Sequence, residues 1–109
     1  MKATAQQIQL VNVAIQNVAD AVTAPAKACA VMLLQAYCPG IRMTALGTWA
    51  ETWPADEAET RRRHLRRRGR EVRLERRGAE VTLVYPGNAP EPLVNPVTRA
   101  FQAALLGGC

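Results

Sequence analysis

Aromatic side chains are scarce in this sequence, at 5% of 109 residues, although hydrophobic residues make up 49%. A core of this composition must be filled by aliphatic side chains and alanine, which favours closely packed helices. The two tryptophans, Trp49 and Trp53, lie four residues apart and are expected in that core. The chain is long enough for one domain with a modest core and too short for two. We therefore expect a single domain over residues 1–109.

Side chains that carry catalysis or bind metals are equally few. His64 is the only histidine, and the three cysteines, Cys29, Cys38 and Cys109, have neither paired nor metal-ligand spacing. No Asp, Ser or Cys is spaced around His64 as in a catalytic triad, and the sequence contains no glycine-rich phosphate-binding loop. We expect no enzyme, no metal and no cofactor. An odd number of cysteines without pairing favours reduced thiols and a cytoplasmic location.

The sequence also lacks a basic leader and a long apolar run. Residues 1–10 contain one lysine and several glutamines, which is unlike a secretory signal. The most apolar window, residues 24–37, is too short to span a bilayer and is interrupted by Lys27. We therefore expect no membrane partner.

Lysine is nearly absent, because arginine outnumbers it twelve to two. Ten of the twelve arginines lie in residues 61–77 with only Glu71 and Glu75, a local charge of +8. The formal net charge is +5, so the remainder carries +5 − 8 = −3. A GC-rich genome would explain arginine in place of lysine but not this clustering. A mildly acidic body with one concentrated basic segment favours a polyanionic partner.

Two helices are predicted in the first third of the chain. Apolar residues recur in steps of three and four over residues 4–22 and define one face. This face consists of Ile8, Val11, Ile15, Val18 and Val22. Pro25 opens a second helix over residues 25–37, because proline is tolerated in a first helical turn. That helix is apolar on nearly every side, so we expect it in the centre of the core.

The rest of the chain is predicted to combine helices with one hairpin. Thr44 is expected to cap a short helix over residues 45–53. A helix over residues 56–68 begins with acids and ends with arginines, which suits the helix dipole. The apolar period then becomes two, which predicts a β-hairpin over residues 71–85. A last helix is predicted over residues 96–106.

Three short stretches carry a resemblance to a known family. They are Thr44-Ala45-Leu46 at the start of the short helix, Leu65-Arg66-Arg67-Arg68-Gly69 at the end of the next helix, and Arg70-Glu71-Val72-Arg73-Leu74-Glu75 leading into the hairpin. In this order of elements, residues 25–85 resemble the winged helix-turn-helix domains of small bacteriophage and mobile-element proteins. The resemblance implies a mostly α, α+β fold with additional N- and C-terminal helices.

The resemblance further implies that residues 56–68 form a recognition helix and that the hairpin is a wing reaching the adjacent backbone. Because Asp56, Glu57 and Glu59 would repel phosphate, we expect the contacts to come from the arginine-rich helix end and the wing. The expected DNA-binding residues are Thr44, Arg61, Arg63, Arg66, Arg67, Arg70, Arg73, Arg76 and Arg77. Guanidinium groups suit this task because they donate in a fork to phosphate or guanine. Thr44 would direct the backbone N–H groups of a capped helix toward a phosphate.

These observations predict a double-stranded DNA-binding protein, a transcriptional regulator or accessory factor of a phage or mobile element. Two alternatives stay open. The same arginines suit structured RNA, and a phage-type inhibitor would use them to dock on an acidic protein. His64 lies among the arginines and is expected on the surface without a role of its own.

The helices predicted over residues 4–22 and 96–106 exceed the minimal winged-helix unit. They either complete the core of the monomer or form a homodimer. A homodimer would read a palindromic site, because a two-fold protein binds two symmetric half-sites.

Overall fold

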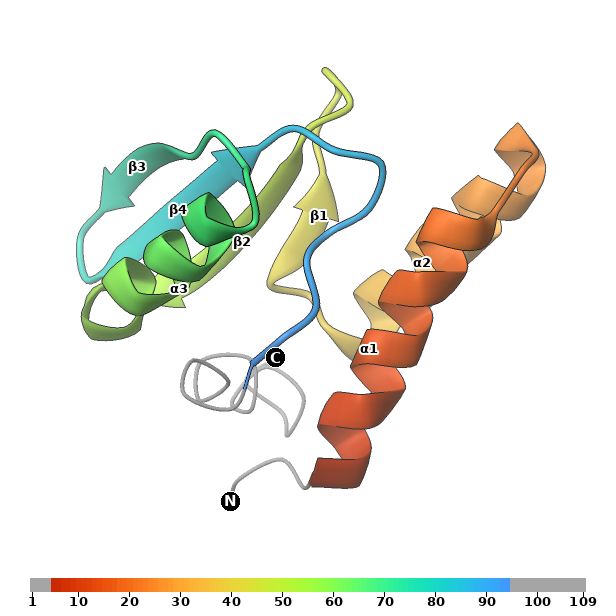
Figure 1. Ribbon diagram of the computed structural model, residues 1–109, viewed down its shortest axis with the longest axis horizontal. Coiled ribbons are helices and arrows are strands. Elements are labelled where there is room, and N and C mark those ends of the chain that lie inside the picture. The colour runs from red at the N-terminus through yellow and green to blue at the C-terminus, as the bar shows by residue number, and fades with distance from the viewer. Residues whose placement is uncertain (1–4, 95–109) are drawn as a thin grey trace.

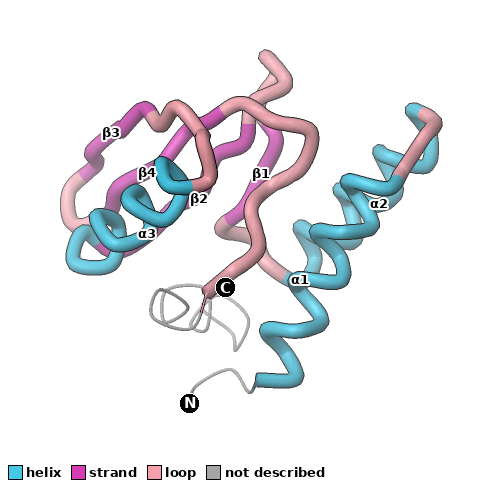
Figure 2. Tube along the Cα trace, in the orientation of Figure 1, coloured by secondary structure: helices cyan, strands magenta, loops and turns pink. Residues whose placement is uncertain are grey.

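The computed structural model describes residues 5–94 and shows an α+β fold in which three helices accompany a four-stranded antiparallel sheet (Figure 1). The elements are α1 (Ala5–Asp20), α2 (Ala24–Tyr37), β1 (Ile41–Met43), β2 (Trp49–Pro54), α3 (Ala55–Arg67), β3 (Arg73–Arg77) and β4 (Glu80–Tyr85). Figure 2 shows the helical hairpin at one end and the sheet with α3 at the other. The helix predicted over residues 96–106 lies outside the described residues.

The helical hairpin forms where the sequence predicts it. The helix expected over residues 4–22 is confirmed as α1, in which Val11, Ala14, Ile15 and Val18 are buried. The placement of Val22 on this face is wrong, because Val22 follows the end of α1 and is exposed. Thr23 separates the two helices, because its side-chain oxygen accepts a hydrogen bond from the backbone of Ala26 at 3.2 Å. This apolar face of α1 is therefore used within the chain, whereas a homodimer through α1 stays a prediction.

The position expected for α2 is wrong. The helix itself is confirmed, but only Val31 and Leu34 are buried, and α2 lies at the outside of the described fold. Met32 is 70% exposed and Leu33 is 48% exposed. An all-apolar surface permits burial on every side, whereas the described elements cover α2 on one side only.

The short helix predicted over residues 45–53 is also wrong. Residues 41–54 instead form the hairpin β1–β2, closed by a bond from the backbone N–H of Thr44 to the carbonyl of Thr48 at 2.8 Å. Gly47 adopts φ +79° in the turn, a conformation that glycine adopts without a steric cost. Tryptophans four apart fit one face of a strand as well as one face of a helix, since four is an even spacing.

One face of the sheet packs against α3. The strand order is β1-β2-β4-β3, and the Arg61 side chain of α3 bonds to Glu51 of β2. Residues directly opposite each other on neighbouring strands share a face, as do residues two apart on one strand. The α3 side therefore carries the buried residues Ile41, Trp49, Trp53, Val81, Leu83 and Tyr85. The expected burial of both tryptophans is confirmed.

The hairpin predicted over residues 71–85 is confirmed as β3 and β4, joined at Gly78. The helix predicted over residues 56–68 is confirmed as α3. It ends in a Schellman motif, in which the N–H of Arg70 bonds to the carbonyl of Leu65 at 3.0 Å. A β-hairpin separates α2 from α3 where a helix-turn-helix needs a short helix, so the winged helix-turn-helix arrangement is not confirmed.

Candidate nucleic-acid interface

Helix α3 directs its arginines to different sides. Ala58, Arg61 and Leu65, spaced by three and four, are buried against the sheet. Arg63, Arg66 and Arg67 lie on the solvent side and are exposed. No ion pair joins these three to a carboxylate in the described part of the chain. The prediction that they are available for a polyanion is consistent with this geometry.

The assignment of Arg61 to a DNA contact is wrong, because its side chain is completely buried. It donates to both oxygens of Glu51, at 2.7 Å and 2.9 Å. It also donates to the carbonyls of Pro92 at 2.9 Å and Glu91 at 2.8 Å. Burial disfavours its charge, but the buried Glu51 outweighs this and raises the pKa of Arg61 above its ordinary value. Arg61 joins α3 to β2 and to the segment after β4.

Glu51 is the centre of this buried network. Its carboxylate also accepts the indole N–H of Trp53 at 2.9 Å and the hydroxyl of Tyr85. The Tyr85 oxygen in turn accepts the backbone N–H of Glu91. In the described residues no buried side-chain nitrogen or oxygen lacks a partner. This network therefore holds β2, α3, β4 and the segment after β4 together.

Arg70 is also used within the chain, which corrects its assignment to DNA. Its guanidinium donates to Glu91 at 2.8 Å and to the carbonyls of Pro86 and Ala89. Its Cζ lies 5.5 Å from the centre of the Tyr85 ring, a distance at which cations bind aromatic faces. Its side chain is only 20% exposed. Arg70 fixes the segment after β4 onto the sheet.

The β3 arginines lie on two different faces of the sheet. Arg76 pairs directly with Val81, so it lies on the α3 side, whereas Arg73 pairs with Val84 and lies on the opposite side. Arg77 pairs with Glu80 and shares the side of Arg73. Of the three β3 arginines, Arg76 is therefore the one that shares the α3 side of the sheet.

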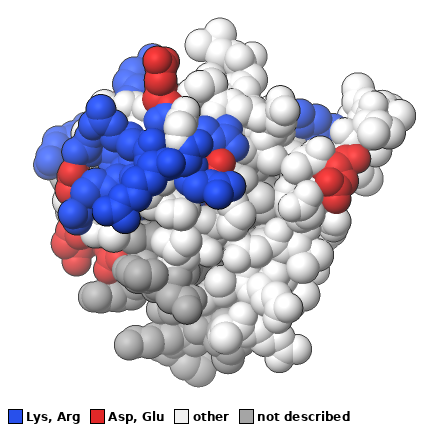
Figure 3. Space-filling model, viewed as in Figure 1, with Lys and Arg blue, Asp and Glu red and all other residues white. Residues whose placement is uncertain are grey.

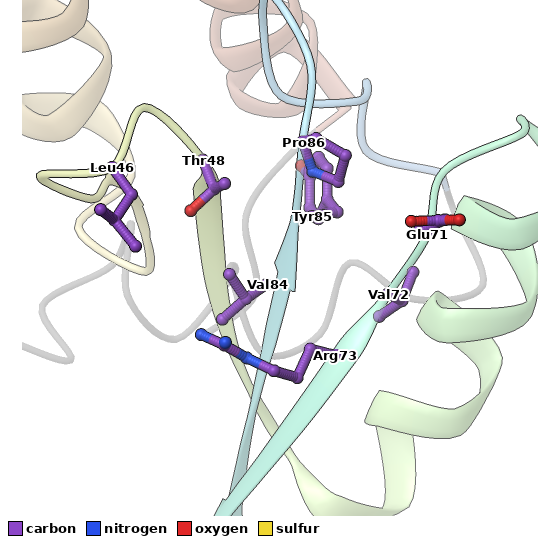
Figure 4. A pocket seen from close by; sticks show the side chains of 8 residues that line it. All are labelled: Leu46, Thr48, Glu71, Val72, Arg73, Val84, Tyr85 and Pro86. Atoms are coloured by element: carbon purple, nitrogen blue, oxygen red, sulfur yellow. The ribbon is translucent and has the colours of Figure 1, made fainter.

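Arg73 lines a hollow of about 330 Å³ on the far side of the sheet. Figure 4 shows its side chain lying along the sheet toward Val84. It also pairs with Glu75 at 3.1 Å. The other lining residues are Leu46, Thr48, Glu71, Val72, Tyr85 and Pro86. This placement separates Arg73 from the arginines of α3.

Thr44 does not cap a helix, which corrects its assignment to the site. Its hydroxyl oxygen lies 2.7 Å from that of Thr48 and accepts the backbone N–H groups of Leu46 and Thr48, each at 3.3 Å. These bonds stabilise the β1–β2 turn. No helix N-terminus is present there to bind a phosphate.

Among residues 5–94, four exposed arginines without an ion pair share the α3 side of the sheet. We call them the arginine face: Arg63, Arg66, Arg67 and Arg76. Figure 3 shows basic side chains gathered over α3 and β3, whereas the helical hairpin is almost uncharged. Arg62 lies beside this face but binds Glu59, and this hydrogen bond holds the pKa of Glu59 below its ordinary value. Arg68 likewise pairs with Glu91 at 2.9 Å.

A second hollow, of about 340 Å³, lies along one flank of α3. It is lined by Thr60, Arg63, His64, Arg67 and Val94. Burial of the imidazole and the nearby charge of Arg61 lower the pKa of His64 below its ordinary value. His64 was expected on the surface without a role of its own, and its position in this hollow was not predicted. No sequence signal reveals it, because Val94 comes from a segment thirty residues away (94 − 64 = 30).

The described residues give no basis for metal binding or for a bilayer-spanning segment. Residues 5–94 contain no group of three or more His, Cys, Asp or Glu side chains that could hold a metal ion. None of the three helices in this range combines the length and the apolar character needed to cross a membrane. Comparison of the chain with known protein families, curated proteins and solved structures finds no match.

Proposed function

We propose that this protein binds double-stranded DNA by placing the arginine face on the phosphate backbone. The proposal is supported by one observation above all. Four arginines from two elements lie on one side of the sheet, exposed and without an ion pair among residues 5–94. Guanidinium groups that are exposed and form no ion pair are suited to bind phosphate oxygens in a bidentate manner.

The charge distribution along α3 defines which end lies on DNA. Asp56 is exposed in the first turn, whereas Arg66 and Arg67 are exposed in the last turn. Phosphates are repelled by the first turn and attracted by the last. The C-terminal half of α3 therefore lies closest to the backbone in this proposal. Arg76 lies nearer the first turn of α3, because its partner Val81 pairs with Trp53, two residues before this helix begins.

This geometry favours contact with the backbone over reading of base edges. A phosphate contact positions a protein but carries no sequence information. A regulator's sequence preference would need contacts beyond the arginine face. We therefore propose backbone binding as the core activity, and a transcriptional or accessory role in a mobile element would be built on it.

The salt dependence of binding tests this proposal. If the four arginines each neutralise one phosphate, log K falls against log salt with a slope of about −3.6. Fluorescence anisotropy with a random duplex measures this slope. The double variant Arg66→Gln/Arg67→Gln should reduce it to about −1.8, because two phosphate contacts are lost.

A matched control removes the same charge from the opposite side of the sheet. Arg42 pairs with Ala50, which in turn pairs with Val84, so Arg42 shares the face of Arg73. The double variant Arg42→Gln/Arg73→Gln should therefore leave the slope near its wild-type value. Equal effects of the two double variants would contradict the assigned face.

Two further results would redirect the function. Preferential binding of duplex RNA of the same length would contradict the DNA assignment and favour the RNA alternative. Absence of binding to either duplex at low salt would contradict nucleic-acid binding altogether. The arginine face would then be a docking surface for an acidic protein.

A further inference from the structure

The hollow beside α3 brings hydrogen-bond donors together within the arginine face. Thr60, Arg63, His64 and Arg67 line one side of it, and Val94 lines the other. Residues three and four apart on a helix are neighbours on its surface, with Cβ atoms about 5–6 Å apart. Arg63 and Arg67 are one such pair, and Thr60 and His64 are another. Four donor side chains therefore border one recess of about 340 Å³.

The donors define the chemical class of the ligand. Two guanidinium groups, a hydroxyl and an imidazole offer N–H and O–H groups, and within residues 5–94 no carboxylate lines the hollow. Arg63 and Arg67 form no ion pair with a carboxylate within residues 5–94. A compact anion with several acceptor oxygens satisfies such donors best, and phosphate is the group that arginine forks match.

We propose that the hollow is a phosphate-binding site in which His64 is a pH-sensitive contact. This inference rests on the proposed function in that a phosphodiester of the DNA backbone is the expected source of the phosphate. Free phosphate presents the same chemistry, and the experiment below separates the two sources. Arg63 and Arg67 supply permanent charge, whereas the contribution of His64 depends on its protonation.

The surroundings of His64 set the direction of the pH dependence. Burial is the largest influence on its pKa and lowers it. The charged neighbours are Arg61 and Arg68 on α3, which lower the pKa, and Glu91 after β4 and Glu51 on β2, which raise it. The net pKa lies below the ordinary value of 6.5, so the imidazole is neutral at pH 7 in the free protein.

A bound phosphate favours the imidazolium form and raises this pKa. Proton binding and phosphate binding then support each other, so affinity rises as the pH falls from the pKa of the complex to that of the free protein. A rise of 0.5 to 1 unit in the pKa corresponds to a roughly three- to tenfold gain in affinity across that interval. Arginine contacts give no such dependence, because guanidinium remains charged throughout.

The first test is duplex affinity from pH 7.5 down to one pH unit below the free-protein pKa of His64, which the titration below measures, at constant ionic strength. Wild-type protein should bind a random 20-base-pair duplex roughly three to ten times more tightly at the lower pH. His64→Gln should abolish this gain. Arg76→Gln is the matched control, because Arg76 belongs to the arginine face but does not line the hollow. It should weaken binding at every pH and retain the gain.

The second test is the NMR titration of the single histidine, which reports its pKa directly. The pKa of His64 should rise when the duplex is added and should not rise when the duplex is added to Arg63→Gln/Arg67→Gln. Addition of inorganic phosphate alone separates the two sources. A rise at millimolar inorganic phosphate without a rise on duplex addition identifies a site for free phosphate.

The failure of this inference is distinguishable from the failure of the proposed function. Steep, salt-dependent duplex binding with the same pH profile in wild type and His64→Gln would overturn the phosphate site and leave DNA binding intact. Absence of duplex binding together with an unchanged His64 pKa in both ligands would overturn both. Absence of duplex binding with a raised pKa in inorganic phosphate would overturn the proposed function alone.

Discussion

Arg61→Met should lower the free energy of unfolding of this protein far more than Arg63→Met does. Arg61 is fully buried and holds both oxygens of Glu51, whereas Arg63 is exposed on the same helix. Arg61→Met leaves the buried Glu51 carboxylate with the indole of Trp53 and the hydroxyl of Tyr85 as its side-chain donors. Removing one partner of a buried ion pair costs about 3–5 kcal/mol.

The size of this loss is measurable because the whole domain is only marginally stable. A domain of this length has a free energy of unfolding of about 5–15 kcal/mol. A loss of about 4 kcal/mol lowers the melting temperature by roughly 16 °C, at about 4 °C per kcal/mol. Arg63→Met should change stability by no more than about 0.5 kcal/mol, as is usual for exposed positions.

Urea denaturation followed by tryptophan fluorescence is the assay. Trp49 and Trp53 are both buried, so their emission reports loss of the core. The double variant Glu51→Gln/Arg61→Met removes both charges and keeps an acceptor for Trp53, so it should lose less stability than the two single variants added together. If Arg61→Met is as stable as Arg63→Met and weakens DNA binding, Arg61 is a surface contact and this reasoning is refuted.

Three further predictions concern the segment after β4 and the cysteines. Gly87→Ala should lower the free energy of unfolding, measured by urea denaturation, by about 1–3 kcal/mol, because φ is +149° and a Cβ would collide with the guanidinium of Arg70. Gly47→Ala should lower it less, because Gly47, at φ +79°, has open space around it. Glu91→Gln should flatten the loss of stability in acid, since burial disfavours its charge but hydrogen bonds from Arg70 and Arg68 outweigh this and hold its pKa below 4.5. That stabilisation is complete above pH 4.5 and is lost as the pH falls through the lower folded pKa, so a wild-type-like acid profile in Glu91→Gln would count against it. In a Cys109→Ser background, a thiol reagent at pH 8 should label the exposed Cys29 and spare Cys38. Burial, and to a smaller extent the charge of Glu51, raise the pKa of Cys38 to about 12. Equal labelling of both cysteines in the folded protein would refute the burial of Cys38.

The periodicity of the sequence was sufficient for the elements whose packing is local. The helices α1 and α3 and the hairpin of β3 and β4 follow from the spacing of apolar residues and from local helix and turn signals, and these elements are confirmed. The hairpin β1–β2 was missed because the spacing of Trp49 and Trp53 fits either period. Gly47 was the informative signal, since its turn needs a positive φ.

The site was predictable by composition but not residue by residue. The cluster of arginines identified the segment, yet Arg61 shares its buried face with Ala58 and Leu65, spaced by three and four. That spacing could have assigned Arg61 to the core. Its partner Glu51 could not be found, because Glu51 lay in a stretch predicted as helix and the pairing joins residues ten apart on different elements. The division of the β3 arginines between two faces depends on the register with β4.

The salt dependence of duplex DNA binding tests the central claim most directly. Wild-type protein should bind with a slope of log K against log salt of about −3.6, and Arg66→Gln/Arg67→Gln should halve it. Arg42→Gln/Arg73→Gln, on the opposite face of the sheet, should leave the slope unchanged. A flat salt dependence in the wild type, or an equal reduction in both double variants, would contradict DNA binding through the arginine face.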